Sequence, residues 1–337
     1  AVNIIKNAKT QGAKAVKEIS ANARFALTGT PVENRLSELW SIFDFLMPGF
    51  LYSYRKFRER YELPIVKNQD PEALTALRRM TGPFVLRRLK KDVLRELPGK
   101  EERIVYSAAS GRQQKLYTAS ALKLKEALAG GAWSGNGKLE VLSQLMRLRQ
   151  ICCDPALCFE DYTGESAKLE TCVSLIASAS AAGHKILLFS QFASMLERIR
   201  ERLLQEGISS HLLVGATPKE ERSRMVQAFA SDEVPVFLIS LKAGGTGLNL
   251  TAADIVIHYD PWWNVAAQNQ ATDRAYRIGQ EKPVTVYKLI LKDTIEENLL
   301  KLQNAKLALA AQVVSEGMVS LGDLSQNELM ELFEQNP

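Results

Sequence analysis

Residues 240–280 read SLKAGGTGLNLTAADIVIHYDPWWNVAAQNQATDRAYRIGQ and lie around two short apolar runs. One run ends at Ser240 and the other covers residues 255–259, and short apolar runs bounded by turn residues are typical of buried strands. A loop with three glycines joins the two runs, and a helical segment that stops near Gly279 follows the second. A strand, a loop, a strand and a helix in this order indicate an α/β fold.

The same alternation continues on both sides of this stretch. Further apolar runs predict strands at residues 185–190, 209–214 and 284–291, with helices at about 193–206 and 217–230. Such an alternation predicts a parallel sheet that is covered by helices on both faces. Because ligands bind at the carboxyl ends of the strands in sheets of this kind, the loops after Ser190, Ser240 and Tyr259 are expected to form the site.

The first half of the chain has a different pattern. Residues 24–28 form one apolar run that predicts a single strand, and residues 36–80 and 112–149 have helical patterns. Glycines at 130–137 interrupt the second helical region, and residues 84–100 form a connector that closes with Leu-Pro-Gly. We therefore expect a sheet remnant, a helical insertion, a connector, a second helical insertion and then a complete α/β lobe.

The bulk composition limits the classes of protein. A chain of 337 residues is long enough for two lobes, and its net charge of +5 is compatible with nucleic acid, although solvated helix faces explain the basic clusters as well. The four cysteines contain no Cys-x-x-Cys pair, which argues against a zinc site and favours a reduced intracellular protein. No apolar run is long enough to span a membrane.

Arg274 and Arg277 are three residues apart, so on a helix they share one face. Gly279 predicts that the helix ends just beyond them, which would place two guanidinium groups side by side in the last turn. One interpretation is a surface helix whose arginines pair with nearby acids. The other is a phosphate site, because the planar guanidinium suits phosphate and can stabilise a γ-phosphoryl group during transfer.

The glycine-rich loop at 240–250 allows backbone N–H groups to approach an anion, and Lys242, Thr246 and Asn249 add side-chain donors. A tight strand-to-helix turn explains the glycines equally simply. The chain contains neither the Gly-x-x-x-x-Gly-Lys-Ser/Thr phosphate loop nor an acidic Asp-Glu-x-His box for magnesium. It thus has arginines suited to phosphoryl transfer without the groups that hold a nucleotide's phosphates and metal.

Four stretches resemble motifs of the Swi/Snf family of ATP-dependent DNA translocases, in helicase superfamily two. Residues 240–280 resemble motifs V and VI, and KILLFSQF, residues 185–192, resembles motif IV. ALTGTPVENRLSELWSIFDFLMPG, residues 26–49, resembles motif III and the segment after it, and FVLRRLKKDVLRELPGK, residues 84–100, resembles the segment between the lobes. The resemblance covers nearly the whole chain in the family's order.

The resemblance implies a core of two RecA-like lobes with ATP in the cleft between them. The fold class would be α/β: a RecA-like parallel sheet lobe with helices on both faces, helical protrusions and a remnant of a first RecA-like lobe. Residues 1–83 would end lobe one with a protrusion, residues 84–100 would connect the lobes, and residues 101–297 would form lobe two with a protrusion at about 110–155. Residues 298–337 would be a helical tail. ATP and Mg²⁺ would be bound mainly by a part of lobe one that precedes this sequence.

Matching positions also imply roles for individual residues. Catalysis would use Arg274 and Arg277 as fingers on the γ-phosphate, together with Gln270. The nucleotide would contact Gly245, Gly247 and Asp273. The DNA backbone would contact Lys242, Thr246, Asn249, Trp263, Ser190 and Gln191. Coupling between ATP and DNA would involve Thr28, Gly29, Thr30, Arg87 and Arg88. Core packing for Trp263, a simple turn for residues 28–30 and a surface role for Arg87 and Arg88 are the alternatives.

The implied function is the C-terminal part of a DNA-dependent ATPase that moves along double-stranded DNA without unwinding it and remodels a DNA-bound protein. The chain alone is expected to be inactive, and its location is expected to be the cytoplasm of a prokaryote, on the nucleoid, rather than a nucleus or a membrane. Two alternatives stay open: a non-catalytic nucleic-acid-binding module on the same fold, and a related RNA helicase.

Overall fold

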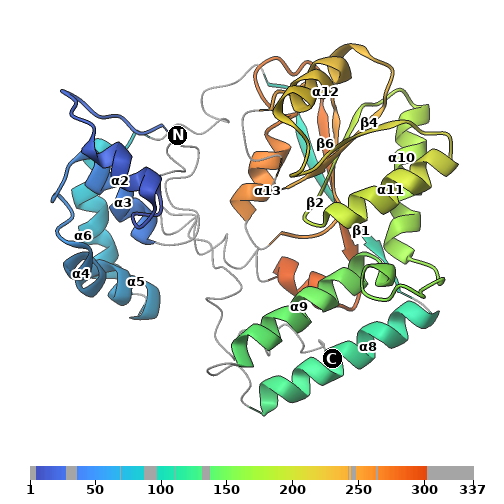
Figure 1. Cartoon of the computed structure of the whole chain (residues 1–337), viewed down its shortest axis with the longest axis horizontal. Coiled ribbons are helices and arrows are strands. Elements are labelled where there is room, and N and C mark those ends of the chain that lie inside the picture. The colour runs from blue at the N-terminus through green and yellow to red at the C-terminus, as the bar shows by residue number, and fades with distance from the viewer. Residues whose placement is uncertain are drawn as a thin grey trace. The chain divides into compact units, whose positions relative to one another are not determined.

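The computed structural model describes residues 5–27, 36–68, 70–86, 97–109, 111–130, 137–241, 243, 248–262 and 265–301, without the side chains of residues 138 and 266. It divides into two compact units, one built mainly from residues 1–95 and the other mainly from residues 96–305, and each is described by itself (Figure 1).

The larger unit is built on a six-stranded sheet in which every neighbouring pair is parallel. Its order is β1-β6-β5-β2-β4-β3. The strands are β1 (Lys100–Ser107), β2 (Ile186–Ser190), β3 (Ser210–Leu213), β4 (Val236–Ser240), β5 (Ile255–His258) and β6 (Val284–Leu291). The predicted parallel sheet is confirmed, and β1 is a strand that was not predicted.

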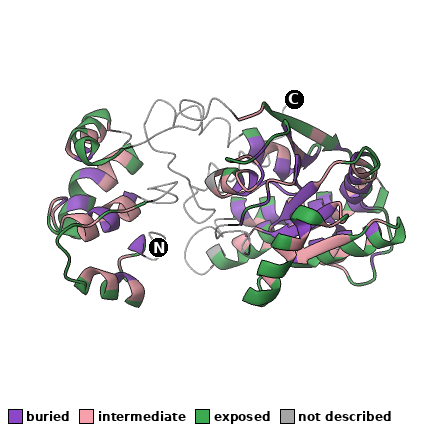
Figure 2. Ribbon diagram, turned by 90° about the horizontal axis from the view of Figure 1, so that it is seen from above, coloured by how far each residue is buried: buried purple, intermediate pink, exposed green. Residues whose placement is uncertain are grey.

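Helices cover both faces of this sheet, as predicted. The helices are α10 (Ala167–Ala181), α11 (Ala193–Gln205), α12 (Lys219–Ser231) and α13 (Val265–Thr272). On one face, Leu188 packs in a cluster with side chains of α10 and α11. On the other, Leu187 and Phe189 pack in a cluster that includes Phe229 of α12 and Ala271 of α13. Figure 2 shows these buried residues concentrated in the sheet and in the inner sides of its helices.

A helical hairpin belongs to the same unit. It consists of α8 (Gly111–Ala129) and α9 (Gly137–Cys153), which pack against each other, and a short 3₁₀ turn, η3 (Pro155–Leu157), comes after it. This confirms the helical pattern predicted at 112–149. Residues 295–301 form a further helix after β6, whereas the rest of the predicted tail, to residue 337, lies outside the described residues.

The smaller unit is helical in its described part. Its elements are α2 (Gln11–Glu18), α3 (Leu36–Leu46), α4 (Tyr54–Phe57), the π-helical turn η1 (Arg58–Glu62), α5 (Leu63–Asn68), α6 (Pro71–Thr81) and η2 (Gly82–Phe84). They enclose a small core around Phe43, Phe57 and Tyr61. The helical pattern predicted at 36–80 is therefore confirmed.

The strand predicted at residues 24–28 is wrong for its described part. Residues 24–27 have no regular secondary structure, and the side chains of Phe25 and Leu27 are 84% and 89% exposed. A strand needs a neighbour for its backbone hydrogen bonds, and the described residues of this unit contain no other strand. Arg24 instead donates to the carbonyl oxygens of Phe45 at 2.8 Å and Ile19 at 2.8 Å.

The cysteines are all free, and no cluster of three metal-ligating side chains occurs within the described ranges. Cys152, Cys153 and Cys172 are buried, so they serve as packing residues in the larger unit. Among the described helices, none combines the length and apolar character that a membrane span requires.

Candidate functional site

The loops after Ser190, Ser240 and Tyr259 lie next to one another, as the predicted sheet requires. Strand β2 lies between β4 and β5, so their carboxyl ends share one edge of the sheet. The N–H of Leu241 donates to the carbonyl of Ser190 at 2.9 Å, and that of Tyr259 donates to Phe189 at 2.9 Å. The sheet ladder thus continues into the loops and fixes where each one begins.

A buried carboxylate organises two of these loops. The hydroxyl of Ser190 donates to Oδ1 of Asp260 at 2.5 Å, and the N–H of Gln191 donates to the same oxygen at 3.2 Å. Burial raises the pKa of Asp260, whereas Arg149 and the two donors oppose that rise by stabilising the carboxylate. The Ser190 side chain is fully buried, so its hydroxyl is engaged within the protein.

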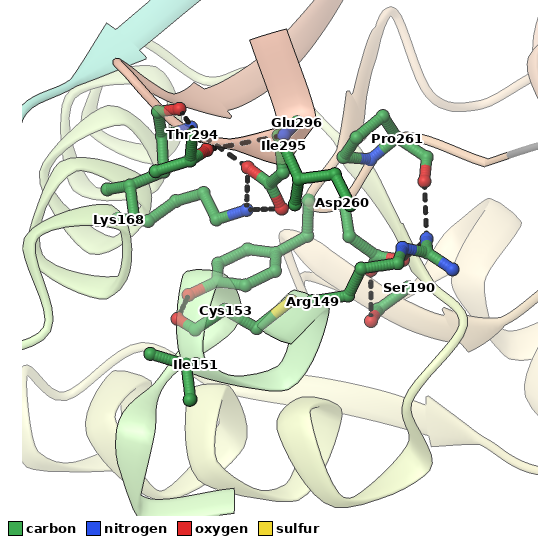
Figure 3. Close-up of polar contacts among 12 residues, drawn as sticks. Arg149, Ile151, Cys153, Lys168, Ser190, Asp260, Pro261, Thr294, Ile295 and Glu296 are labelled. Atoms are coloured by element: carbon green, nitrogen blue, oxygen red, sulfur yellow. Dashed lines mark hydrogen bonds and ion pairs between the residues drawn. The ribbon is translucent and has the colours of Figure 1, made fainter. Parts of the chain in front are cut away.

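Arg149 of α9 reaches the same two loops (Figure 3). Its side chain is 2% exposed, with Nη1 donating to Oε1 of Gln191 at 2.8 Å and Nη2 donating to the carbonyl of Pro261 at 2.6 Å. Nη2 also lies 3.7 Å from Oδ2 of Asp260. The helical hairpin therefore contacts the sheet's carboxyl edge through a buried charge.

The segment with the two arginines differs from the prediction. Helix α13 ends at Thr272, so Arg274 and Arg277 lie in the turns after it rather than in its last turn. The carbonyl of Arg274 accepts from the N–H of Leu250 at 3.0 Å, which ties this segment to another part of the chain instead of to a further helical turn. Gly279, at φ +95°, provides the left-handed residue that the end of this segment requires.

The two guanidinium groups nevertheless affect each other. Burial lowers the pKa of Arg274, the positive charge of Arg277 lowers it further, and Asp273 opposes both. Nε of Arg274 is buried and has no hydrogen-bond partner within the described part of the chain. Two cations with an unsatisfied buried donor form a site that an anion such as phosphate would stabilise.

Gln280 fastens the arginine segment to the loop before β5. Its Nε2 donates to the carbonyls of Ala253 at 2.8 Å, Thr251 at 3.1 Å and Ala275 at 3.2 Å, and its Oε1 accepts from the N–H of Lys282 at 2.9 Å. Arg277 adds a contact from Nη1 to the carbonyl of Leu248 at 3.3 Å. The arginines are therefore held in position by the end of the glycine-rich loop.

Asn249 is exposed between the buried side chains of Leu248 and Leu250, so it points outward from an anchored segment. Gln270 on α13 and Asp273 just after it are partly exposed. Arg222 of α12 holds the start of the loop by donating from Nη1 to the carbonyl of Ala243 at 3.2 Å. The remaining predicted site residues lie outside the described residues: Lys242, Gly245, Thr246, Gly247, Trp263, Thr28, Gly29, Thr30, Arg87 and Arg88.

A buried histidine connects α13 to the sheet. Nε2 of His258 lies 2.9 Å from the hydroxyl of Thr272, the last residue of α13, and the ring stacks on Phe189. Burial lowers the pKa of His258 to about 3, and Lys288 contributes to the lowering, so the ring is neutral at neutral pH. His258 thus positions the point from which the arginine segment starts.

The sequence had not singled out Arg149, Asp260, Gln280, Arg222 or His258. Two of them had a local signal. Asp260 directly follows a predicted buried strand, and Arg149 lies at the end of a helical pattern beside Ile151. Their contacts, however, join residues that are 42 to 112 positions apart in the sequence, and periodicity carries no information on such pairs.

Comparison with known proteins identifies the family. A model described as SNF2-related domain matches residues 3–157, and one described as helicase conserved C-terminal domain matches residues 167–279. The chain is 42% identical to YwqA of Bacillus subtilis (strain 168) over 98% of its own length and 36% of that protein. It is 40% identical to an uncharacterized ATP-dependent helicase of Mycoplasma genitalium, with 98% of this chain and 32% of that protein covered. The chain thus spans about a third of the length of these relatives.

The structure of the Sulfolobus solfataricus SWI2/SNF2 ATPase core in complex with dsDNA has the same fold. The TM-score is 0.61 at 36% identity, and the match covers 100% of this chain and 72% of that one. The structural match agrees with the parallel sheet described above, and the sequence identity agrees with the resemblance of the motifs. The chain belongs to the SNF2 family of helicase-like proteins.

Proposed function

We propose that this chain forms the C-terminal part of an ATP-dependent translocase that moves along double-stranded DNA. The observation that carries the proposal is the arrangement of Arg274 and Arg277, two mutually repelling cations held by Gln280 and Leu250 beside the glycine-rich loop. The ATP dependence of a helicase relative and the duplex DNA in the related SWI2/SNF2 core support the same function.

The arginines would act on the nucleotide as fingers. ATP supplies the phosphoryl group whose negative charge must be stabilised during hydrolysis. Arg274 and Arg277 would donate to the γ-phosphate oxygens, and the anion would relieve the repulsion between them. Gln270 and Asp273 would lie at the nucleotide with them. The phosphates and Mg²⁺ would be held mainly by a part of the ATPase core that this chain does not contain. The match to the related core covers 72% of that core.

The loops at the carboxyl ends of β2, β4 and β5 would contact the DNA backbone. Gln191 and the exposed Asn249 are the described candidates, and Lys242, Thr246 and Trp263 are the others. Contacts of this kind are phosphate-directed, so binding should depend weakly on sequence and strongly on salt. ATP-driven closing and opening of the two lobes would then advance the protein along one strand.

The direct test is ATP hydrolysis by the full-length protein with no nucleic acid, with duplex DNA and with RNA. We expect duplex DNA to stimulate ATP hydrolysis by the full-length protein. This chain alone is expected not to hydrolyse ATP. Stimulation by RNA instead would favour a related RNA helicase. An inert full-length protein that still binds DNA would favour a non-catalytic binding module.

A further inference from the structure

We propose that Arg149 is a positioning residue that fixes the loops at 190–192 and 259–262 to each other and to the α8–α9 hairpin. In this way it would set how Gln191 meets the DNA backbone. The inference rests on the proposed function, and it adds a mechanical link from the hairpin to the loops.

The first support is the shape of the contact. One guanidinium reaches across two loops, with Nη1 on the Gln191 side chain at 2.8 Å and Nη2 on the Pro261 carbonyl at 2.6 Å. The two loops follow adjacent strands, β2 and β5, and Asp260 of the second loop also accepts from Ser190 and Gln191 of the first. A planar fork with fixed donor directions can satisfy both acceptors at once, whereas a lysine ammonium is a compact point charge on a flexible stem.

The second support is that the last turns of α9, which carry Arg149, are themselves held by hydrogen bonds. One turn later on α9, the carbonyl of Cys153 accepts from the hydroxyls of Tyr259 at 2.8 Å and Ser166 at 3.1 Å. The carbonyl of Ile151 accepts from Nε2 of Gln113 on α8 at 3.0 Å. The last turns of α9 are therefore fastened both to Tyr259, which directly follows β5, and to the first helix of the hairpin, so a displacement of the hairpin would be carried to Arg149.

The third support is the comparison with a second buried ion pair in the same unit. Lys168 and Glu296 are 0% and 1% exposed and lie 2.5 Å apart, and their hydrogen bonds join α10 to residues 291–296 (Figure 3). Within the described residues the hydrogen bonds of this pair reach neither loop, although Nζ of Lys168 lies 5.2 Å from the centroid of the Tyr259 ring. Arg149 directs its donors to the two loops instead, which a purely structural charge at this place would not require.

The test compares Arg149→Lys with Arg198→Lys. Arg198 is a matched control because it also pairs with an aspartate near the end of α9, with Nε 2.9 Å from Oδ2 of Asp154, without contacting either loop. Hydrogen exchange is measured in peptides covering residues 190–192 and 259–262, and the DNA concentration that half-saturates ATP hydrolysis is measured in the full-length protein. A double variant, Arg149→Met with Asp260→Asn, removes both buried charges together and serves if the single change prevents folding. It is compared with Asp260→Asn alone, because Asp260 also joins the two loops.

We expect Arg149→Lys to speed exchange in both loops and to raise the half-saturating DNA concentration on the order of tenfold to a hundredfold, with a smaller change in the maximal rate. Arg198→Lys should leave both quantities at the wild-type value. Exchange and half-saturation that match the control would overturn the inference, as would faster exchange with unchanged half-saturation. A wild-type protein that DNA does not stimulate would instead refute the proposed function, and exchange alone would then decide whether Arg149 fixes the loops.

Discussion

The backbone N–H of Leu250 donates to the carbonyl of Arg274 at 3.0 Å, which joins the end of the glycine-rich loop to the arginine segment. A displacement of the end of this loop would therefore also displace the arginine segment. In the proposed function the loop contacts DNA and the arginines contact ATP, so this bond is a short physical route between the two ligands. Gln280 strengthens the route by donating to Thr251, Ala253 and Ala275.

Gln280→Met tests that route. The variant keeps the side chain's length but leaves buried carbonyls without their donor, which should cost about 1–3 kcal/mol of unfolding free energy. The misplaced arginines should also lower ATP turnover, on the order of a hundredfold. Chemical denaturation and steady-state hydrolysis measure the two effects. Turnover at the wild-type level in a folded variant would show that Gln280 does not position the arginines.

The buried pair of Lys168 and Glu296 gives a prediction about stability. Burial lowers the pKa of Lys168, but the attraction of Glu296 outweighs this and the pKa is raised, so the lysine is charged. Lys168→Met leaves an uncompensated carboxylate and should cost about 3–5 kcal/mol of unfolding free energy. Lys168→Met combined with Glu296→Gln should cost less, because the amide oxygen can still accept from the N–H of Leu291. Urea denaturation measures both, and a double variant no more stable than the single one would contradict this account.

His258 gives a prediction about pH. Its pKa falls from 6.5 in the unfolded chain to about 3 in the folded one, so protonation favours unfolding. The stabilisation is complete above pH 6.5 and is lost as the pH falls from 6.5 towards 3. At pH 5 the free energy of unfolding should therefore be about 2 kcal/mol lower than at neutral pH. His258→Gln keeps a polar partner for Thr272 without titrating, so its unfolding free energy should fall less between pH 7.5 and pH 5. Equal losses in the two proteins would be inconsistent with a neutral buried histidine.

The cysteines give a prediction about reactivity. Cys152, Cys153 and Cys172 are fully buried, and burial raises the pKa of each thiol. Cys158 is partly exposed, although burial raises its pKa as well. A thiol reagent should therefore modify Cys158 first in the native protein and the other three only after denaturation. Peptide mapping identifies the modified residue, and early modification of Cys172 would contradict the packing described here.

The sequence predicted the buried strands well because each one is a continuous apolar run in a parallel sheet covered on both faces. It missed β1 because an edge strand has fewer buried side chains: residues 100–104 are exposed, and four of these five are charged. The apolar run at 24–28 shows the opposite error, since composition indicates a strand but cannot show whether a partner strand is present.

The candidate site was predictable where a residue type and its local spacing carry the chemistry, as for Arg274 and Arg277. The end of α13 at Thr272 was not, because the Leu250–Arg274 bond between distant segments competes with another helical turn. Arg149 shows the same limit more strongly. A helical pattern places it on α9, but only the folded chain brings it to Gln191 and Pro261.

The central claim is that Arg274 and Arg277 act on the phosphate of ATP. We would measure ATP hydrolysis by the full-length protein, with and without duplex DNA, for wild type, Arg274→Ala, Arg277→Ala and the surface control Arg55→Ala. Arg55 is a suitable control because its side chain is 90% exposed. The account predicts that either arginine variant loses about a thousandfold or more of DNA-stimulated turnover while duplex binding persists, and that the control is unaffected. Turnover by either variant at the level of wild type would show that these arginines are ordinary surface residues.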